Sequence, residues 1–560
     1  MPVARTRCVA LIGVSGRVVE VEADVGRGVP GTHLIGLLDT ALSEARGRVR
    51  SAVINSGFVW PDARITVSLF PAGLPKKGGH FDLAIAVSLL AGANLVPAAR
   101  IADPFFIGEL GLDGTIRPVR GVLPAMLAAA EAGADTAVVP VANIAEARLV
   151  PGITVVPAEN LALLVGWLRS GRPDGPWPVS GASAQTIGAG MPAGGEAALG
   201  GGARRCRQAG DEPYAHEDDP GAATPPLVPR TEPYAHGDDP PGLDLADVAG
   251  QAAARHALEV CAAGGHNLWM LGPPGTGKTM LAERLPTLLP PLERDQALEI
   301  TAIHSVAGTL PPGEPLLTRA PFMAPHHTAT AAAIIGGGSG MVRPGAVSLA
   351  HRGVLFLDEA PEFPASVLES LRQPLESGVV TVSRAAGTVT FPARFLLVLA
   401  SNPCPCGHAG GQDNICVCTP HLRRRYLARL SGPLLDRVDV KVMLRRFTRR
   451  ELLADRRFIE SSKVVAERVL AARERAAKRL AGTPWRCNAE VPTSALHGDL
   501  RLEEEATAPL QRCLDTGELS ARGVDRALRL SWTLADLAGK DRPTIDETHA
   551  ALTLWLGEQW

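Results

Sequence analysis

The sequence contains no apolar run that approaches the ~20 residues a helix needs to cross a bilayer. Its first residues, MPVARTRCVALIG, also lack the long apolar stretch and the small-residue cleavage site of a secretory leader. Both absences favour a cytoplasmic protein without a membrane partner. The composition, 46% apolar and 20% charged, is typical of a soluble globular chain, and 560 residues are enough for roughly three or four domains.

An excess of charge of one sign is absent as well. Lysine and arginine together number 56 against 58 aspartates and glutamates, so the net charge is −2. This balance argues against a globally basic surface that binds nucleic acid. Any contact with DNA would depend on local basic patches.

Cysteines are few and mostly isolated. Four of the nine fall within one short stretch, and the other five stand singly, at Cys8, Cys206, Cys261, Cys487 and Cys513. This distribution predicts reduced thiols with one local cluster. It argues against the disulfide framework of a secreted protein.

The composition along the chain divides it into four blocks. Residues 1–168 alternate short β-rich runs with helical ones, which predicts a compact α/β domain. Residues 169–242 are rich in Gly, Pro, Ala and Ser and predict a disordered linker, because they hold too few large apolar side chains to offset the entropy of ordering. Residues 243–445 predict a second α/β domain, and residues 446–560 show helical periodicity that predicts a separate helical module.

The linker contains an internal repeat. EPYAHEDDP (212–220) recurs 20 residues later as EPYAHGDDP (232–240). A duplicated stretch of plain linker explains the repeat. A docking motif, or a weak metal site built on His216 and His236, is the alternative.

The sharpest motif is NLWMLGPPGTGKTMLAERL (267–285), in which an apolar strand runs into a glycine-rich loop and then into a helix. The glycines allow backbone N–H groups to wrap phosphates, and the following helix N-terminus favours negative charge. Lys278 would reach the β- and γ-phosphates of ATP, and the Thr279 hydroxyl would bind Mg²⁺. The predicted nucleotide-binding residues are Gly272, Pro273, Pro274, Gly275, Thr276, Gly277, Lys278, Thr279 and, from a second strand, Asp358.

Two further strands end in polar residues that complete such a site. GVLFLDEAPEF (353–363) ends its apolar run at Asp358 and Glu359; Asp358 would hold Mg²⁺ through its shell, and Glu359 would polarise the attacking water. RFLLVLASN (394–402) ends at Asn402. In P-loop machines of the AAA+ type, a polar residue in that place helps to position the water.

Arginines are the remaining catalytic candidates. SGPLLDRVDV (431–440) contains Arg437. This arginine could reach across a subunit interface into the neighbouring subunit's nucleotide site and stabilise charge in the transition state. In the helical module, Arg522 is placed to contact the γ-phosphate, with Arg526 and Arg529 as nearby alternatives.

With these motifs in order, the chain resembles the ComM (YifB-like) family of magnesium-chelatase-related AAA+ ATPases. Beyond the generic motifs, the resemblance rests on residues 324–363, which begin APHHTATAAAIIGGG, on SGPLLDRVDV, and on residues 36–61, which begin GLLDTALSEARGRVR. It implies an N-terminal domain with the Lon-protease fold, an AAA+ core with a C-terminal helical lid, and a homo-hexameric ring. Family members are described as DNA helicases that promote branch migration during recombination and transformation.

The Lon-like domain lacks its catalytic pair. Lon-type proteases use a serine and a lysine, but PKKGGHFD (75–82) places His80 at the serine position and RGVLP (120–124) places Leu123 at the lysine position. Nothing remains to attack a carbonyl, so protease activity is not expected.

Two loops are candidates for gripping single-stranded or branched DNA. IIGGGSGMVRPG (334–345) carries Arg343 among glycines, and residues 377–395 are patterned as a β-hairpin with Arg384 near its tip. Either arginine could contact phosphates without reading sequence, or be an ordinary solvated charge.

The clustered cysteines follow Asn402 directly, in SNPCPCGHAGGQDNICVC (401–418). Cys404, Cys406, Cys416 and Cys418 can supply four thiolates to a structural Zn²⁺. The C-x-C spacing differs from the common C-x₂-C template, so free or redox-active thiols remain the alternative.

Together these features predict an ATP- and Mg²⁺-dependent hexameric motor that acts on DNA. The alternative is a magnesium-chelatase-type motor that remodels a partner protein. The Lon-like domain and the absence of an appended integrin-like metal-binding module argue against a chelatase.

Overall fold

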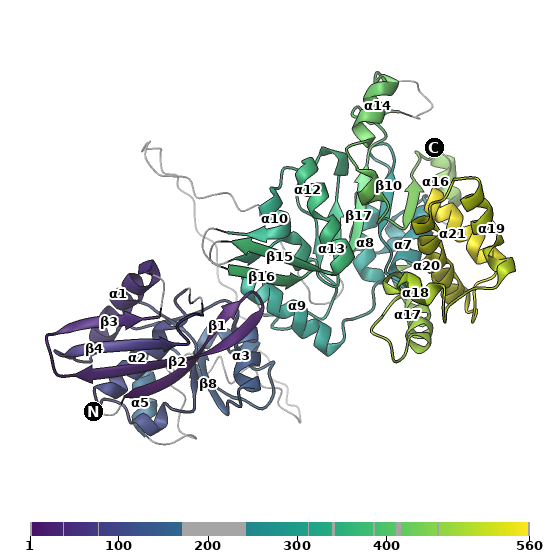
Figure 1. Cartoon of the computed structure of the whole chain (residues 1–560). Helices are drawn as coiled ribbons and strands as arrows, with labels where there is room; N and C mark the ends of the chain where they lie inside the picture. The colour runs from purple at the N-terminus through teal and green to yellow at the C-terminus, as the bar shows by residue number, and fades with distance from the viewer. Residues whose placement is uncertain are drawn as a thin grey trace, which may run out of the picture.

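The computed structural model describes residues 3–36, 39–74, 76, 78–170, 242–311, 313–338, 342–384, 387–409, 416–455 and 458–557. The predicted linker and its repeat lie outside these residues, apart from the end of helix α5 (Leu161–Ser170) and Gly242. The described chain runs from an N-terminal α/β unit through a second α/β unit to a block of helices (Figure 1).

The N-terminal unit is built on a seven-stranded mixed sheet in the order β3-β4-β2-β1-β5-β8-β9. Its elements are β1 (Ala4–Ile12), β2 (Ser15–Gly26), β3 (Gly31–Ile35), α1 (Asp39–Asn55), β4 (Arg64–Phe70), α2 (Asp82–Gly92), β5 (Phe105–Phe106), β6 (Glu109–Leu110), β7 (Ile116–Arg117), α3 (Val122–Glu131), β8 (Thr136–Pro140), α4 (Ile144–Ala147), β9 (Thr154–Ala158) and α5. Strands β1 and β4 pair with β2 in antiparallel fashion, and the other neighbours are parallel. Helix α2 packs on β1 and β2 and is buried along its whole length.

The second α/β unit has a five-stranded parallel sheet in the order β11-β14-β17-β10-β18. Its strands are β10 (Leu268–Leu271), β11 (Phe322–Met323), β14 (Val354–Leu357), β17 (Leu396–Ser401) and β18 (Val440–Met443), and its larger helices are α7 (Ala252–Gly264), α8 (Lys278–Leu288) and α9 (Arg294–Ala307). Strands β10, β14 and β17 are buried throughout, which explains their unbroken apolar sequences. Because all five strands run in parallel, the carboxyl ends of β10, β17 and β14 meet at one edge of the sheet, where α/β proteins bind their ligands.

Two small antiparallel hairpins project from this unit. One pairs β12 (Gly336–Gly337) with β13 (Arg343–Pro344), and the other pairs β15 (Val379–Arg384) with β16 (Gly387–Pro392), as the sequence predicts for residues 377–395. Short helices surround them: α10 (Ala331–Ile335), α11 (Ala346–Leu349), α12 (Ala365–Ser370) and α13 (Arg372–Ser377).

The C-terminal block is helical, and no strand occurs in it among the described residues after Arg446. It comprises α16 (Arg449–Asp455), α17 (Ser462–Arg479), α18 (Thr493–Leu496), α19 (Glu504–Asp515), α20 (Ala521–Ala538) and α21 (Ile545–Leu556); α14 (Pro420–Leu427) and α15 (Gly432–Leu435) precede β18. One apolar core joins α17, α20 and α21 to the sheet, for example through Val469, Leu530 and Val440. None of the described helices is long and apolar enough to span a bilayer.

The two α/β units meet where α3 packs against α9. Glu146 of the N-terminal unit accepts hydrogen bonds from the backbone N–H of Leu123 at 2.8 Å and from the hydroxyl of Ser305 on α9. The N–H of Gly121 donates to the Ser305 carbonyl at 3.2 Å. Ala302 of α9 completes this contact by joining the apolar core of the N-terminal unit.

Candidate nucleotide-binding site

The glycine-rich loop links β10 to α8 and has the geometry of a phosphate cradle. Gly275 and Gly277 have φ values of +78° and +88°, a region that residues with a side chain rarely adopt. A side chain on Gly272 would lie 2.7 Å from the carbonyl oxygen of Leu444, so this position also requires glycine. Helix α8 starts at Lys278, so its N-terminal amides and dipole face the loop.

Lys278 connects the loop to the neighbouring strand. Its ammonium donates to the carbonyl oxygens of Gly272 at 2.6 Å and Pro273 at 3.0 Å, and to Asn402 Oδ1 at 3.1 Å. Burial lowers the pKa of Lys278, while the carboxylates of Asp358 and Glu359 act in the opposite direction. Asn402 thus lies within reach of the group that would neutralise the terminal phosphate.

The acidic pair at the end of β14 faces the start of α8. The Thr279 hydroxyl donates to Asp358 Oδ2 at 2.8 Å, so the two residues expected to hold Mg²⁺ are in contact. Hydroxyl and carboxylate oxygens are the ligands that this hard cation prefers. A bound Mg²⁺ would neutralise phosphate charge, and Glu359, adjacent to Asp358, would orient water toward the phosphate.

A cavity of about 830 Å³ joins these residues. Its lining includes residues 274–280, Asp358, Glu359 and Asn402, and it continues to Val248, Phe447 and Leu452. Val248, Phe447 and Leu452 offer an apolar surface suited to the flat adenine base of a nucleotide. Sequence reasoning missed them, because no local pattern relates them to the glycine-rich loop. Arg445 and Arg446, from the basic run at residues 445–450, also line this cavity.

Glu359 has a neighbour that the motifs did not reveal. His327 Nδ1 lies 3.5 Å from Glu359 Oε2, and both side chains are partly exposed. Glu359 itself has a left-handed backbone, with φ of +50°. His326 and His327 follow one another in the chain, and their ring centroids are 4.1 Å apart. The structure brings His327 to the residue expected to activate water.

The two predicted catalytic arginines lie outside the lining of this cavity. Arg437 is only 8% exposed; its guanidinium donates to the Pro433 carbonyl and to Glu376. Arg522 is exposed at the start of α20. Its alternatives are engaged within the protein: Arg526 pairs with Asp439 at 2.8 Å, and Arg529 donates to the Val491 carbonyl at 2.7 Å.

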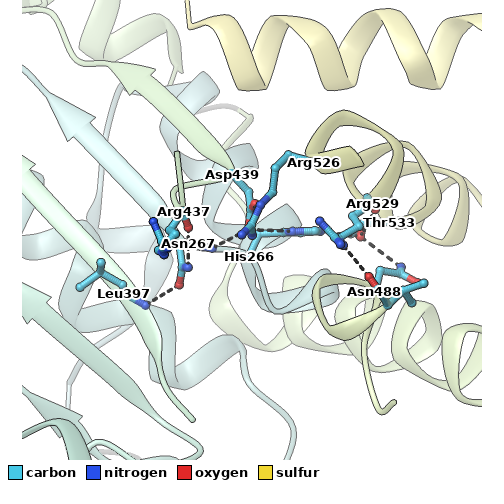
Figure 2. A network of polar contacts seen from close by, with 10 residues as sticks. His266, Asn267, Leu397, Arg437, Asp439, Asn488, Arg526, Arg529 and Thr533 are labelled. Carbon is cyan, nitrogen blue, oxygen red and sulfur yellow. Dashed lines mark hydrogen bonds and ion pairs between the residues drawn. The ribbon is translucent and has the colours of Figure 1, made fainter. Parts of the chain in front are cut away.

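A buried polar network links the sheet to the helical block (Figure 2). Asp439 accepts from Arg526 and from the N–H of Asn267 at 3.3 Å, and its other contact is His266 Nδ1 at 3.4 Å. His266 Nε2 lies 2.7 Å from Thr533 Oγ1 on α20. Burial alone would raise the pKa of Asp439, but Arg526 and His266 hold this pKa well below its usual range. The ionised carboxylate therefore fixes α20 to β18.

The two arginine-bearing hairpins lie side by side. Gly337 pairs with Arg343 across β12 and β13, and a Cβ atom on Gly337 would come within 3.1 Å of Arg384 Nη2. Both arginines are exposed, and neither has an ion-pair partner among the described residues. Residues 385 and 386, between β15 and β16, lie outside the described residues.

The four clustered cysteines converge. Their sulfur atoms all lie within 4.8 Å of one another, next to the end of β17. Cys404 and Cys418 are buried, and Cys406 and Cys416 are partly exposed.

The residues at the Lon dyad positions are both buried. His80 packs against Phe81, with ring centroids 4.7 Å apart, and burial lowers the pKa of His80 to about 4. Leu123 is part of an apolar core. The structure thus has a buried imidazole and a buried aliphatic side chain at the positions where Lon proteases carry the serine and the lysine.

Comparison with known proteins identifies the family. Models described as magnesium chelatase, subunit ChlI, as subunit ChlI of Mg-chelatase, and as the C-terminal part of that subunit match residues 244–452, 21–143 and 459–554. The chain is 38% identical over 545 residues to the competence protein ComM of Haemophilus influenzae and 37% identical over 544 residues to YifB of Escherichia coli, in each case over 97% of this chain and 95% of the relative. The chain belongs to the ComM/YifB family. An uncharacterised Mycobacterium tuberculosis protein is 47% identical over 99% of this chain and 98% of its own length.

Membership in the ComM/YifB family makes the chain an AAA+-type ATPase related to magnesium chelatase. A weaker likeness extends to Lon proteases; that of Geobacter metallireducens is 31% identical over 161 residues, 26% of this chain and 19% of its own. The parallel five-stranded sheet and its glycine-rich loop fit such an ATPase.

Proposed function

We propose that this ComM/YifB-family chain is an ATP-hydrolysing helicase that works as a homo-hexameric ring on single-stranded or branched DNA. In this proposal it promotes branch migration in recombination or transformation and acts in the cytoplasm. The observation that carries the proposal is the pair of adjacent exposed arginines, Arg343 and Arg384, on hairpins of the same unit that binds ATP. The relative named a competence protein favours a role with incoming DNA.

Within the proposed site, Lys278, Thr279 and Asp358 bind ATP and Mg²⁺, Glu359 orients the attacking water, and Asn402 positions the phosphate contact of Lys278. These roles are supported by the Thr279–Asp358 and Lys278–Asn402 hydrogen bonds. Zn²⁺ is proposed as a structural ion at the four cysteines.

The positions of Arg437 and Arg522, the two predicted catalytic arginines, support a ring. Arg437 and Arg522 line no part of the nucleotide cavity, so in a ring they would act on the nucleotide of a neighbouring subunit. Arg437 would first have to leave Glu376, which it contacts within the protomer. Arg522 is exposed and needs no such release.

The proposal is tested by ATP hydrolysis and by migration of a synthetic four-way DNA junction. We expect forked or single-stranded DNA to stimulate hydrolysis, and Lys278→Ala to abolish both activities. The double variant Arg343→Ala/Arg384→Ala should weaken DNA binding and reduce its salt dependence by up to about one unit of log–log slope per lost phosphate contact. Arg372→Ala, which removes a partly exposed arginine paired with Glu369, is the matched control. No DNA binding with a non-hydrolysable ATP analogue, and no stimulation by DNA, would overturn the proposal.

The second candidate is a motor that remodels a partner protein, which the magnesium-chelatase names of all three family models favour. Hydrolysis that requires Lys278 but is indifferent to DNA in every form would support this candidate.

A further inference from the structure

The four cysteines near the nucleotide site have the geometry of a single-ion site. The Sγ atoms of Cys404 and Cys406 are 3.3 Å apart. The Sγ atom of Cys416 lies 3.6 Å from that of Cys404 and 3.5 Å from that of Cys406. A tetrahedral ion with metal–sulfur bonds of about 2.3 Å separates its sulfur ligands by about 3.8 Å. A disulfide would require about 2.05 Å, so these distances correspond to four free thiols gathered around one point.

Backbone amides also support thiolates at this point. Gly407 has a φ of +78°, and the turn it makes directs the backbone of His408 and Ala409 toward Cys404. His408 also hydrogen-bonds to Cys406, and the backbone of Cys406 hydrogen-bonds to Cys418. Outer hydrogen bonds of this kind orient metal ligands and compensate their negative charge.

The segment has little else to hold it together. Its described residues form a separate small cluster that consists of the cysteines and Ala409. Helix α14, which starts two residues after Cys418, stands out from the second α/β unit in Figure 1, and Tyr426 is its only buried residue. A bound ion commonly supplies the stability that so small a core cannot.

We propose that Cys404, Cys406, Cys416 and Cys418 bind one Zn²⁺ and that this ion braces the phosphate-binding loop. Four thiolates in a tetrahedron are the donor set of structural zinc sites. An iron–sulfur cluster divides its four thiolates among two or more iron atoms, so they would not all lie within 4.8 Å of one another as they do here.

The cysteine segment contacts the nucleotide site, so a bound ion would affect how that site is held. Cys404 follows Asn402 by two residues, and Asn402 accepts a hydrogen bond from Lys278. On the other side, a Cβ atom on Gly407 would lie 2.7 Å from Cδ of Pro274 in the phosphate-binding loop. Loss of the ion would therefore loosen both Asn402 and the loop. This coupling rests on the proposed ATP site, whereas zinc binding does not.

Metal analysis of the full-length protein, purified without a metal-chelating tag, tests the site. We expect about one Zn²⁺ per chain, and less than about a fifth of that in Cys406→Ser/Cys416→Ser, which changes only the two partly exposed ligands. Cys513→Ser, which changes a partly exposed cysteine on α19 outside the cluster, is the control and should keep its zinc. Replacement by Co²⁺ should give the intense visible bands of tetrahedral thiolate coordination.

Consequences for nucleotide binding are measured separately, with a fluorescent ATP analogue and by hydrogen exchange on α14. The double variant should bind the analogue several-fold more weakly and exchange faster on α14 than Cys513→Ser. Wild-type protein without stoichiometric zinc, with iron in its place, or with a disulfide within the cluster would overturn the site. So would full zinc content in the double variant. Unchanged analogue binding in a zinc-free variant would overturn the bracing role alone. Zinc without DNA-stimulated hydrolysis would leave the metal site standing and contradict the helicase.

Discussion

Among single residues, Glu359 is held in a position that depends on a side chain far from its own motif. It lies directly after Asp358, at the end of a buried strand, but its carboxylate faces His327, 32 positions earlier in the chain. The segment from His327 leads through α10 to the hairpin that carries Arg343. If DNA binds at the hairpin as proposed, the contact between His327 and Glu359 offers a route by which the DNA alters the orientation of the attacking water.

We predict that His327→Gln raises ATP hydrolysis in the absence of DNA, because it frees Glu359 to orient water. A pair this exposed is worth about 0.2–1 kcal/mol, which limits the increase to about fivefold. The ratio of DNA-stimulated to basal turnover should fall accordingly. His326→Gln is the control, since His326 contacts Thr328 rather than Glu359. A basal rate that falls in His327→Gln would contradict this role.

At the level of elements, a buried carboxylate joins the sheet to the helical block, in addition to the apolar core that the two share. Asp439, the residue just before β18, accepts a hydrogen bond from Arg526 of α20, and His266 continues the connection to Thr533 on the same helix. Arg437 precedes Asp439 by two residues and Arg522 precedes Arg526 by one helical turn. Both proposed catalytic arginines therefore depend on this joint for their positions.

Asp439→Asn should destabilise the protein by about 3–5 kcal/mol, because it leaves Arg526 facing a buried site without its counter-charge. The low pKa of Asp439 means that its contribution is present above the ordinary value of 3.8 and is lost only as the pH falls through the lower folded value. The loss of stability, measured by calorimetric unfolding, should therefore be the same at about pH 8 and about pH 5. Glu460→Gln, which breaks a half-exposed pair with Arg468, should cost less than about 1 kcal/mol. Equal effects of the two substitutions would contradict the joint.

Across the whole molecule, the N-terminal unit touches the ATPase unit at α9 and at the hairpin strand β16. Glu146 and Ser305 meet between α3 and α9, and the β1–β2 turn reaches β16, where a Cβ atom on Gly13 would lie 2.7 Å from Val389. The second contact is with the hairpin that carries Arg384. The N-terminal unit, which lacks the Lon catalytic pair, is thus placed to restrict that hairpin.

Ser305→Asp should separate the two units, because it places a second carboxylate next to that of the buried Glu146 and the two negative charges repel each other. Burial already raises the pKa of Glu146, which shows that this place disfavours negative charge. We expect a larger radius of gyration by X-ray scattering and faster hydrogen exchange on α3 and α9. Ser305→Ala, which removes one hydrogen bond and keeps the apolar contact, should change neither measurement appreciably. An unchanged radius in Ser305→Asp would show that other contacts hold the units together.

The amino-acid sequence alone determined those features of this protein that depend on residues close together in the chain. The phosphate loop was predictable because its glycines and Lys278 act within one strand–loop–helix segment, and Asp358 because it ends a continuous apolar strand. The helical block was predictable from periodicity, and the family from long contiguous motifs. Cysteine spacing supplied four ligand candidates but not their convergence.

Tertiary structure decided every feature that joins distant segments. The order β14-β17-β10 brings Asn402 to Lys278, and the edge strand β11 precedes the segment that brings His327 to Glu359. Folding also placed Phe447 in the nucleotide cavity and Arg437 against Glu376. Strand order and side-chain burial follow from how the whole core packs, and neither leaves a periodic signal in the chain. That is why the nucleotide loop, Asp358 and Asn402 could be found by inspection, whereas the neighbouring residues His327 and Phe447 could not.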